Sequence, residues 1–330
     1  MSNSFGRLFR FTIFGQSHAP AIGVCIEGVP AGLKINMEKL SAFMARRAPG
    51  GLRATSRKEA DEVEFIAGLV DGKSCGAALT AIIKNTDTRS SDYEYMRNIP
   101  RPGHADYTAM VKYGESRDYL GGGQFSGRLT APLCIAGGIA MQLLEEKGIE
   151  IKASIHSIGG ETEEENMLSL IDRVQAEGDS VGGIISCCVT GLMAGVGEPM
   201  FDGLENRIAQ AVFAIPGVKG IEFGAGFEAA NMLGSQCNDP FCLRDGNVQT
   251  ESNKHGGVLG GISSGMPVEF RVAVKPTPSI AKLQRSVDMS EQKETELSIR
   301  GRHDPCIVPR AVPCVEAAAA VAIYDAILEM

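Results

Sequence analysis

Short runs in which apolar and polar residues alternate occur throughout this chain, and this spacing is typical of half-buried β-strands. They predict strands at 7–14, 24–29, 62–69, 77–84, 149–156, 182–191, 219–223 and 267–274. Longer apolar stretches predict helices near 37–47, 131–147, 166–177, 204–214 and 313–329. We expect Asn36 to cap the first helix, because its side-chain oxygen can accept a hydrogen bond from an unpaired backbone N–H, and Pro49 to end it.

Strands and helices are mixed along the chain without a regular strand–helix–strand alternation. This order favours an α+β fold, with sheets packed over helices, rather than a doubly wound parallel sheet. We find neither a low-complexity linker nor a fixed-period repeat, so we expect one domain over residues 1–330. Two polar segments, 85–107 and 251–266, show little periodicity, and such segments usually carry function.

Composition and charge narrow the class of protein. Of the 330 residues 44% are hydrophobic, which is enough for a globular core, and the net charge of −8 argues against a general nucleic-acid-binding protein. The first residues lack the apolar centre of a signal peptide, and we expect no apolar run of membrane-spanning length, so we expect a cytoplasmic protein with no membrane partner. The nine cysteines lack zinc-site spacing; we expect reduced, mostly buried thiols and no metal site.

Histidine is scarce, and its positions suggest a site that handles protons. Four of the five copies fall in polar loops, namely His18, His104, His255 and His303. His156 lies in an apolar, strand-like run and is interpreted as structural. Each loop histidine alone is more often structural or merely exposed. Together, with arginines nearby, they indicate a proton-handling site for an anion.

Arginines gather in three parts of the chain. The groups are Arg46, Arg47, Arg53 and Arg57; Arg101, Arg117 and Arg128; and Arg300, Arg302 and Arg310. Guanidinium groups bind carboxylate and phosphate through paired hydrogen bonds, so this grouping in an acidic protein indicates a small anionic ligand. Arg46 is interpreted as part of a solvated face. Arg53, Arg128 and Arg302 lie in turn-rich polar loops and are interpreted as functional.

Glycine-rich loops at 121–123, 256–261 and 263–265 could bind a phosphate through backbone N–H groups. Lys275 ends a predicted strand and precedes a rigid PTPS turn, which offers a cation and hydroxyl groups to a phosphate or a polar cofactor edge. An ordinary strand-ending turn explains this segment equally well. No loop has the GxGxxG or GxxxxGK[ST] spacing, which argues against a Rossmann dehydrogenase or a P-loop nucleotidase.

Several blocks of sequence, in this order, resemble the signatures of the chorismate synthase family. They are FGRLFRFTIFGQSH, RPGHADYT, RDYLGGG, SGRLT, GGISSG, KPTPS, GRHDPC and RAVPCVEA, and they extend from residue 6 to the C-terminal helix. The resemblance implies a β-α-β sandwich with sheets packed around helices, and a lyase of the shikimate pathway of aromatic amino acid biosynthesis. The implied reaction is an anti 1,4-elimination of phosphate from 5-enolpyruvylshikimate 3-phosphate to give chorismate. The implied cofactor is reduced FMN, with NADPH as a candidate reductant, and the implied assembly is a homotetramer.

The resemblance also implies roles for individual residues. His18 matches the histidine that protonates the departing phosphate, and His104 the one that protonates reduced flavin near N1. Asp304 matches the carboxylate that assists deprotonation at flavin N5, with Ser17 and Ser126 as relay hydroxyls. The substrate-facing positions are Arg47, Arg53 and Arg128. The flavin-contact positions are Gln124, Phe125, Ser126, Asn253, Lys254, Gly260, Lys275, Pro276, Thr277, Pro278, Ser279 and Arg302.

The chain departs from the family pattern at several of these positions. The departures are Gln16, Ala19, Pro20, Ala48, Gln124, Phe125, Gly127, Leu129 and Lys254. His18, His104 and Asp304 are retained, so we expect activity with altered flavin affinity. Two alternatives stay open: a flavin oxidoreductase that uses the same pocket, and a non-catalytic protein that binds an anion or a flavin.

Overall fold

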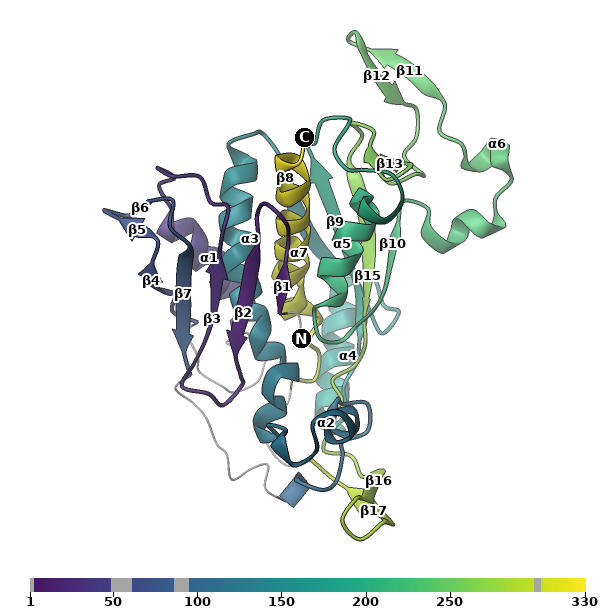
Figure 1. Cartoon of the computed structure of the whole chain (residues 1–330). Coiled ribbons are helices and arrows are strands. Elements are labelled where there is room, and N and C mark those ends of the chain that lie inside the picture. The colour runs from purple at the N-terminus through teal and green to yellow at the C-terminus, as the bar shows by residue number, and fades with distance from the viewer. Residues whose placement is uncertain (1–2, 49–60, 86–94, 300–303) are drawn as a thin grey trace.

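Two antiparallel sheets lie on either side of a layer of helices in the computed structural model, which describes residues 3–48, 61–85, 95–299 and 304–330 (Figure 1). The first sheet has the order β1 (Ser4–Phe5), β2 (Phe11–Gly15), β3 (Ala21–Ile26), β7 (Leu79–Lys84) and β4 (Glu64–Ala67). The second has the order β10 (Val218–Phe223), β15 (Val268–Val274), β9 (Gly183–Thr190) and β8 (Glu150–Ile158). The expected mixed α+β class is confirmed.

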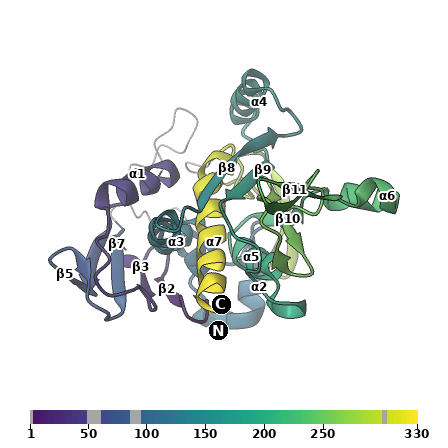
Figure 2. The ribbon, with the colours of Figure 1, turned by 90° about the horizontal axis from the view of Figure 1, so that it is seen from above.

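Two long apolar helices form the middle of the molecule, α3 (Thr130–Glu145) and α7 (Val308–Leu328), flanked by α1 (Met37–Arg47) and α5 (Leu204–Phe213) (Figure 2). The helices α3 and α7 pack very closely. A Cβ atom on Gly137 would lie 2.3 Å from Cβ of Ala317, so only glycine allows this approach. One cluster of buried apolar residues joins these helices to both sheets.

Two apolar helical segments, Gly127–Glu145 and Val308–Leu328, are long and apolar enough to cross a bilayer, contrary to our expectation from the sequence. However, 78% and 89% of their most apolar windows are buried inside the protein. A core helix is buried on all sides and therefore apolar on all sides, so its hydropathy is as high as that of a membrane-spanning helix. Both segments are core helices.

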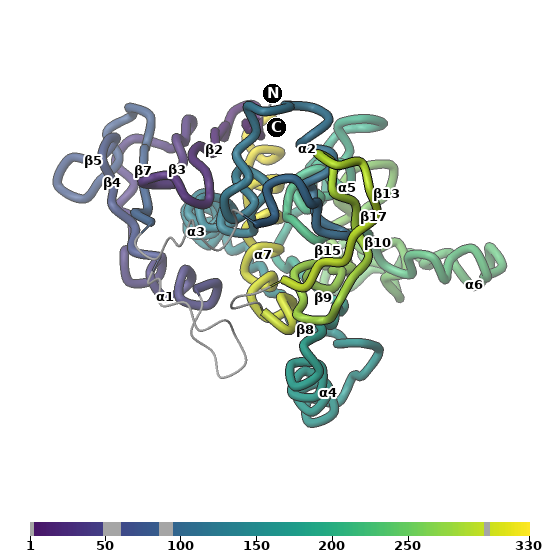
Figure 3. The backbone as a smooth tube through the Cα atoms, turned by 90° about the horizontal axis from the view of Figure 1, so that it is seen from below, coloured from purple at the N-terminus to yellow at the C-terminus, as the bar shows by residue number. Residues whose placement is uncertain are grey.

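The remaining elements lie around this body. They are β5 (Leu69–Val70), β6 (Lys73–Ser74), α2 (Asp106–Tyr113), η2 (Gly114–Ser116), η3 (Leu120–Phe125), η4 (Gly127–Leu129), α4 (Glu164–Ala176), η5 (Met200–Asp202), η6 (Gly226–Asn231), α6 (Gly234–Cys237), β11 (Phe241–Arg244), β12 (Asn247–Thr250), β13 (Val258–Leu259), β14 (Ile262–Ser263), β16 (Gln284–Asp288) and β17 (Lys293–Leu297). Figure 3 shows the α2 region beside the segment that leads to β16. Hydrogen bonds from Arg101 to Ser279 and from Ser286 to Pro100 join these two segments.

The expected helix cap was confirmed, whereas three other expectations from the sequence were wrong in part. Asn36 caps α1 by accepting a hydrogen bond from the backbone N–H of Lys39 at 3.0 Å. The expected strand at 7–14 is wrong in its first half, because residues 7–9 turn around the carboxylate of Asp325, which accepts three backbone hydrogen bonds there. The helix expected from residue 313 begins at Val308 and contains Pro313. His156 is exposed at a bulge in β8 and not packed in the core.

Candidate functional site

A cavity of about 600 Å³ lies where the loops before α3 and α7 meet the turn after β15. Its lining comes from segments 101–105, 121–130, 214–217, 275–279 and 304–314, together with Arg47. This volume is in the usual range for small-ligand sites. A larger cavity of about 1270 Å³ lies beside α1, α3 and the second sheet. Charged residues there are already paired, as Arg46 is with Glu316, so we place the candidate site in the smaller cavity.

The triple-glycine turn holds two histidines close to each other. All three glycines have positive φ angles, of 60°, 87° and 51° for Gly121, Gly122 and Gly123. A Cβ atom on Gly121 would lie 2.1 Å from Cε1 of His18, and one on Gly122 would lie 3.2 Å from Nε2 of His104. Because side chains are excluded here, the two imidazole rings lie against neighbouring residues of the same turn.

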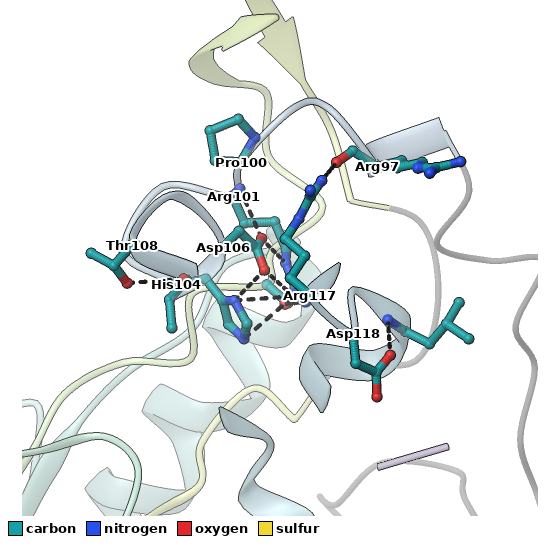
Figure 4. Close-up of polar contacts among 12 residues, drawn as sticks. Arg97, Pro100, Arg101, His104, Asp106, Thr108, Arg117 and Asp118 are labelled. Carbon is teal, nitrogen blue, oxygen red and sulfur yellow. Dashed lines mark hydrogen bonds and ion pairs between the residues drawn. The ribbon is translucent and has the colours of Figure 1, made fainter. Parts of the chain in front are cut away.

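His104 is held by an acidic and a basic neighbour (Figure 4). Its Nδ1 lies 2.6 Å from Oδ1 of Asp106, and Nη2 of Arg101 lies 3.1 Å from the same ring nitrogen. Arg101 also donates from Nε to Asp106 at 2.7 Å. Burial raises the pKa of Asp106, but hydrogen bonds and charge from Arg101 and His104 outweigh it and hold that pKa well below its usual range. Asp106 is therefore ionised and fixes the orientation of the ring.

A buried carboxylate joins two cavity-lining arginines. Asp61 forms ion pairs with Arg47 from α1 and Arg128 from η4 through its two oxygens. The three residues are 2–7% exposed. Burial is the largest single influence and lowers the pKa of Arg47, but the charges of Asp61, Cys314 and Cys134 and the hydrogen bond to Asp61 together raise that pKa above its usual value. Arg47 also donates from Nε to Thr130 at 3.0 Å, so its guanidinium has a fixed position at the cavity wall.

The opposite wall carries hydroxyl groups and one amine. Lys275 donates to the carbonyl of Gly103, and burial lowers the pKa of this lysine. Oγ1 of Thr277 is buried and has no hydrogen-bond partner within the part of the chain that the structure describes. Asp304, at the edge of the cavity, accepts from Nη1 of Arg310 at 2.6 Å. The cavity therefore offers cations, hydroxyls and a carboxylate in addition to the imidazole of His104.

Comparison of the sequence and the structure with known proteins shows the family of this chain. A sequence model of chorismate synthase matches residues 9–328. Proteins named chorismate synthase from Dehalococcoides mccartyi strain 195, Korarchaeum cryptofilum and Thermococcus gammatolerans are 46%, 45% and 46% identical to the chain, and the alignments cover 98% of it and 96–97% of each relative. The chain belongs to the chorismate synthase family. A crystal structure of chorismate synthase superposes with a TM-score of 0.75 at 26% identity, over 98% of this chain and 93% of that one.

Most positions that resemble chorismate synthase site residues lie at this cavity. Its lining includes Arg47, His104, Gln124, Phe125, Ser126, Arg128, Lys275, Pro276, Thr277, Pro278, Ser279 and Asp304. His18 and Ser17 lie directly behind Gly121. Ser126 accepts a hydrogen bond from the backbone N–H of Arg128 at 3.2 Å. Arg53 and Arg302 lie outside the described residues, as do His303, Arg57 and Arg300.

Three positions expected to contact the flavin do not line this cavity in one chain. Asn253 donates to the carbonyl of Pro267 at 2.9 Å, Lys254 donates to the carbonyl of Gln236, and Gly260 is exposed near β13. His255 accepts a hydrogen bond from the N–H of Gly257 at 2.8 Å in the same region, which is a structural role. Arg46, interpreted from sequence as solvated, pairs with the buried Glu316 at 2.6 Å.

The sequence analysis missed Asp61 and Asp106, although both organise the site. Asp106 lies two residues after His104 and five after Arg101, and this spacing at the start of a helix was a usable signal. Asp61 had no such signal, because its two partners lie 14 and 67 residues away in the chain.

Proposed function

We propose that this cavity carries out the chorismate synthase reaction, the elimination of phosphate from 5-enolpyruvylshikimate 3-phosphate to give chorismate. Chorismate synthase activity, that of a phosphate-eliminating lyase of the shikimate pathway, follows from the family to which the chain belongs. The observation that carries the proposal is a pair of histidines packed against one glycine turn, in a site whose lining also holds two buried arginines. Such a site can bind an anion and deliver protons to it.

The lining fits reduced FMN as the cofactor. Phe125 offers an apolar surface that is 36% exposed, and Lys275 offers a positive charge. A polar group of a ligand could form a hydrogen bond with the hydroxyl of Thr277, which has no partner among the described residues. Such a bond would be favourable, because a buried hydroxyl without a partner costs free energy. When bound, reduced FMN supplies an electron-rich ring that assists loss of the phosphate. NADPH is the proposed source of the reducing electrons.

In this proposal the protein's own residues orient the reactants and hold protons. Arg47, Arg53 and Arg128 bind the anionic groups of the substrate, and Arg302 contacts the flavin. His18 donates a proton to the departing phosphate, and His104 holds a proton at the N1 edge of the flavin. Asp304 accepts a proton near N5, with the hydroxyls of Ser17 and Ser126 as relays.

We further propose a single cytoplasmic domain of the β-α-β sandwich type that assembles as a homotetramer. An arm formed by residues 226–250, with η6, α6, β11 and β12, projects from the body at the upper right of Figure 1. It exposes Phe227, Leu233, Phe241, Leu243 and Val248, each at least 64% exposed. Exposed apolar residues in such a group mark interaction surfaces. A second copy docked on this arm would bring Asn253, Lys254 and Gly260 near another cavity.

Replacing both Phe241 and Leu243 with aspartate should dissociate the assembly. Burying two charges in an apolar contact costs several kcal/mol, which a contact between copies cannot offset. Light scattering after gel filtration should give the tetramer mass for the wild type and for a Val287→Asp control on β16. A monomeric or dimeric mass is expected for the double variant. An unchanged tetramer would show that the arm does not join copies.

Replacing Asp106 with asparagine should release the ring of His104. The carboxylate holds the ring in one orientation, so its loss should lower turnover roughly 10–100-fold. Nitrogen NMR of the His104 ring without cofactor should show a changed tautomer in Asp106→Asn. The control is Asp179→Asn, which removes a partly exposed carboxylate paired with Lys282. A wild-type spectrum together with wild-type turnover would refute this positioning role.

The direct test of the function is phosphate release from 5-enolpyruvylshikimate 3-phosphate without oxygen, with catalytic FMN, in the presence and absence of dithionite. Phosphate and chorismate should appear together and only with reduced flavin. Consumption of reductant in step with product would favour the oxidoreductase alternative. Tight flavin binding without phosphate release would favour the binding-protein alternative.

A further inference from the structure

Two thiols lie side by side at the floor of the cavity. Sγ of Cys134 in α3 is 3.8 Å from Sγ of Cys314 in α7. Both side chains are buried, at 0% and 2% exposure, and both cysteines are free thiols. Cys314 nevertheless lines the cavity, so a small molecule that enters the cavity meets this sulfur.

The packing of the two helices brings the backbones of these cysteines close together. Gly137 lies three residues after Cys134, and Ala317 three residues after Cys314, so each pair shares one face of its helix. The helices approach closely at Gly137 and Ala317, where a Cβ atom on the glycine would lie 2.3 Å from Cβ of Ala317. A disulfide requires Cα atoms within about 7 Å, and the close packing one turn away together with the Sγ–Sγ distance of 3.8 Å favours such a bond.

The surroundings make the two sulfurs chemically unequal. The hydrogen bond from Cys134 lowers the pKa of Cys314, and the charges of Arg47 and Arg310 lower it further, although burial opposes them. Burial raises the pKa of Cys134. A thiolate beside cations is the attacking sulfur in thiol oxidation, and a protonated neighbour can resolve the product. Cys314 is therefore the attacking thiolate, and Cys134 is the protonated thiol that resolves the product.

We propose that Cys134 and Cys314 form a site of reversible oxidation, at which hydrogen peroxide converts the two thiols into a disulfide. The Cys314 thiolate attacks one peroxide oxygen, so an S–O bond forms, the O–O bond breaks and hydroxide leaves, which becomes water by taking up the proton that Cys314 had released. The sulfur of Cys134 then attacks the sulfenic sulfur, so the S–S bond forms, the S–O bond breaks, and the hydroxide that departs takes the Cys134 thiol proton and leaves as a second water. The two sulfurs lose two electrons, which reduce the peroxide.

The oxidant has a plausible local origin and the product a local effect. Dioxygen that reaches a reduced flavin yields peroxide, so this source rests on the proposed function, whereas the chemistry of the pair does not. The disulfide removes negative charge beside Arg47, whose guanidinium is tied to Thr130, one turn before Cys134 in α3. Oxidation therefore alters the charge balance at the anion-binding wall.

The test uses the full chain, without flavin or substrate, treated with hydrogen peroxide and then digested under non-reducing conditions. We expect a Cys134–Cys314 cross-link, the loss of two hydrogen atoms in intact mass, reversal by dithiothreitol, and oxidation about tenfold faster than at any other thiol. Cys134→Ala should prevent the cross-link and leave a sulfenic acid at Cys314 that dimedone traps. The control Cys187→Ala, at another buried cysteine, should cross-link like the wild type.

Three results would overturn the proposal: no cross-link in the folded protein, a cross-link that forms only after denaturation, or equal oxidation of the remaining cysteines. Circular dichroism before and after peroxide decides whether the protein stayed folded. Because neither flavin nor substrate is present, failure here leaves the proposed function untouched, and failure of phosphate release leaves this proposal untouched.

Discussion

Replacing His18 or His104 with alanine is expected to lower the rate of phosphate release by roughly 10²–10⁴-fold, the usual contribution of a general acid. The ring of His104 lines the cavity and that of His18 lies against Gly121 in the cavity wall, which places both imidazoles at the edge of the site. Since neither ring is needed to bind the anion, turnover should fall more than the KM for the substrate rises. The measurement is anaerobic phosphate release at saturating substrate and reduced flavin.

The matched control for these variants is His156→Ala, which removes an exposed histidine from β8 and should keep wild-type turnover. Thermal unfolding separates loss of a proton donor from loss of structure, because a folded but inactive His104→Ala protein is the expected result. Wild-type turnover in both His18→Ala and His104→Ala would refute their assigned roles. A large loss in only one would assign proton transfer to that ring alone.

Replacing Asp61 with asparagine is expected to lower the free energy of unfolding by about 3–5 kcal/mol. The carboxylate pairs with two buried arginines, and its removal leaves Arg47 and Arg128 as uncompensated cations in a buried place. The matched control is Asp179→Asn, whose ion pair with Lys282 is largely exposed and should contribute about 1 kcal/mol or less. Urea denaturation of the apoprotein measures both changes.

A second substitution makes the Asp61 prediction specific. Adding Arg47→Met to Asp61→Asn removes one of the two stranded charges, so the double variant should be more stable than the sum of the two single changes. Additive changes would mean that the three side chains are not coupled. A stability loss below about 1 kcal/mol in Asp61→Asn would mean that water or an ion replaces the carboxylate.

The sequence alone predicts those structural features that depend on residues close together in the chain. The cap of α1 at Asn36, the strands of the second sheet and the apolar character of α3 follow from local spacing, and each was found close to its expected place. The candidate catalytic positions, and most of the cavity-lining positions named in advance, came from family motifs and not from physical derivation. Local spacing alone gave only glycine turns, loop histidines and grouped arginines.

The contacts that shape the site depend on tertiary structure. Asp61 meets Arg128 across 67 residues, and the N–H of Arg7 meets Asp325 across 318. A pattern of apolar and polar residues contains no information about such pairs, because it describes which side of an element is buried and not what lies opposite. The pattern did predict α7 as a helix, but from residue 313 and not from Val308, because a helix buried on every side has no polar face to mark where it begins.

The central position of α7 has a consequence for how the molecule is made. This helix packs against α3, α5 and strands of the second sheet, and its Asp325 holds the turn before β2 in the first sheet. Yet α7 is synthesised after every strand that the structure describes. A nascent chain therefore carries both sheets and α3 without α7, and the apolar faces that α7 covers stay open to water and to other chains until α7 emerges. We expect folding to be late and dominated by contacts distant in sequence, with chaperones needed most just before α7 is complete.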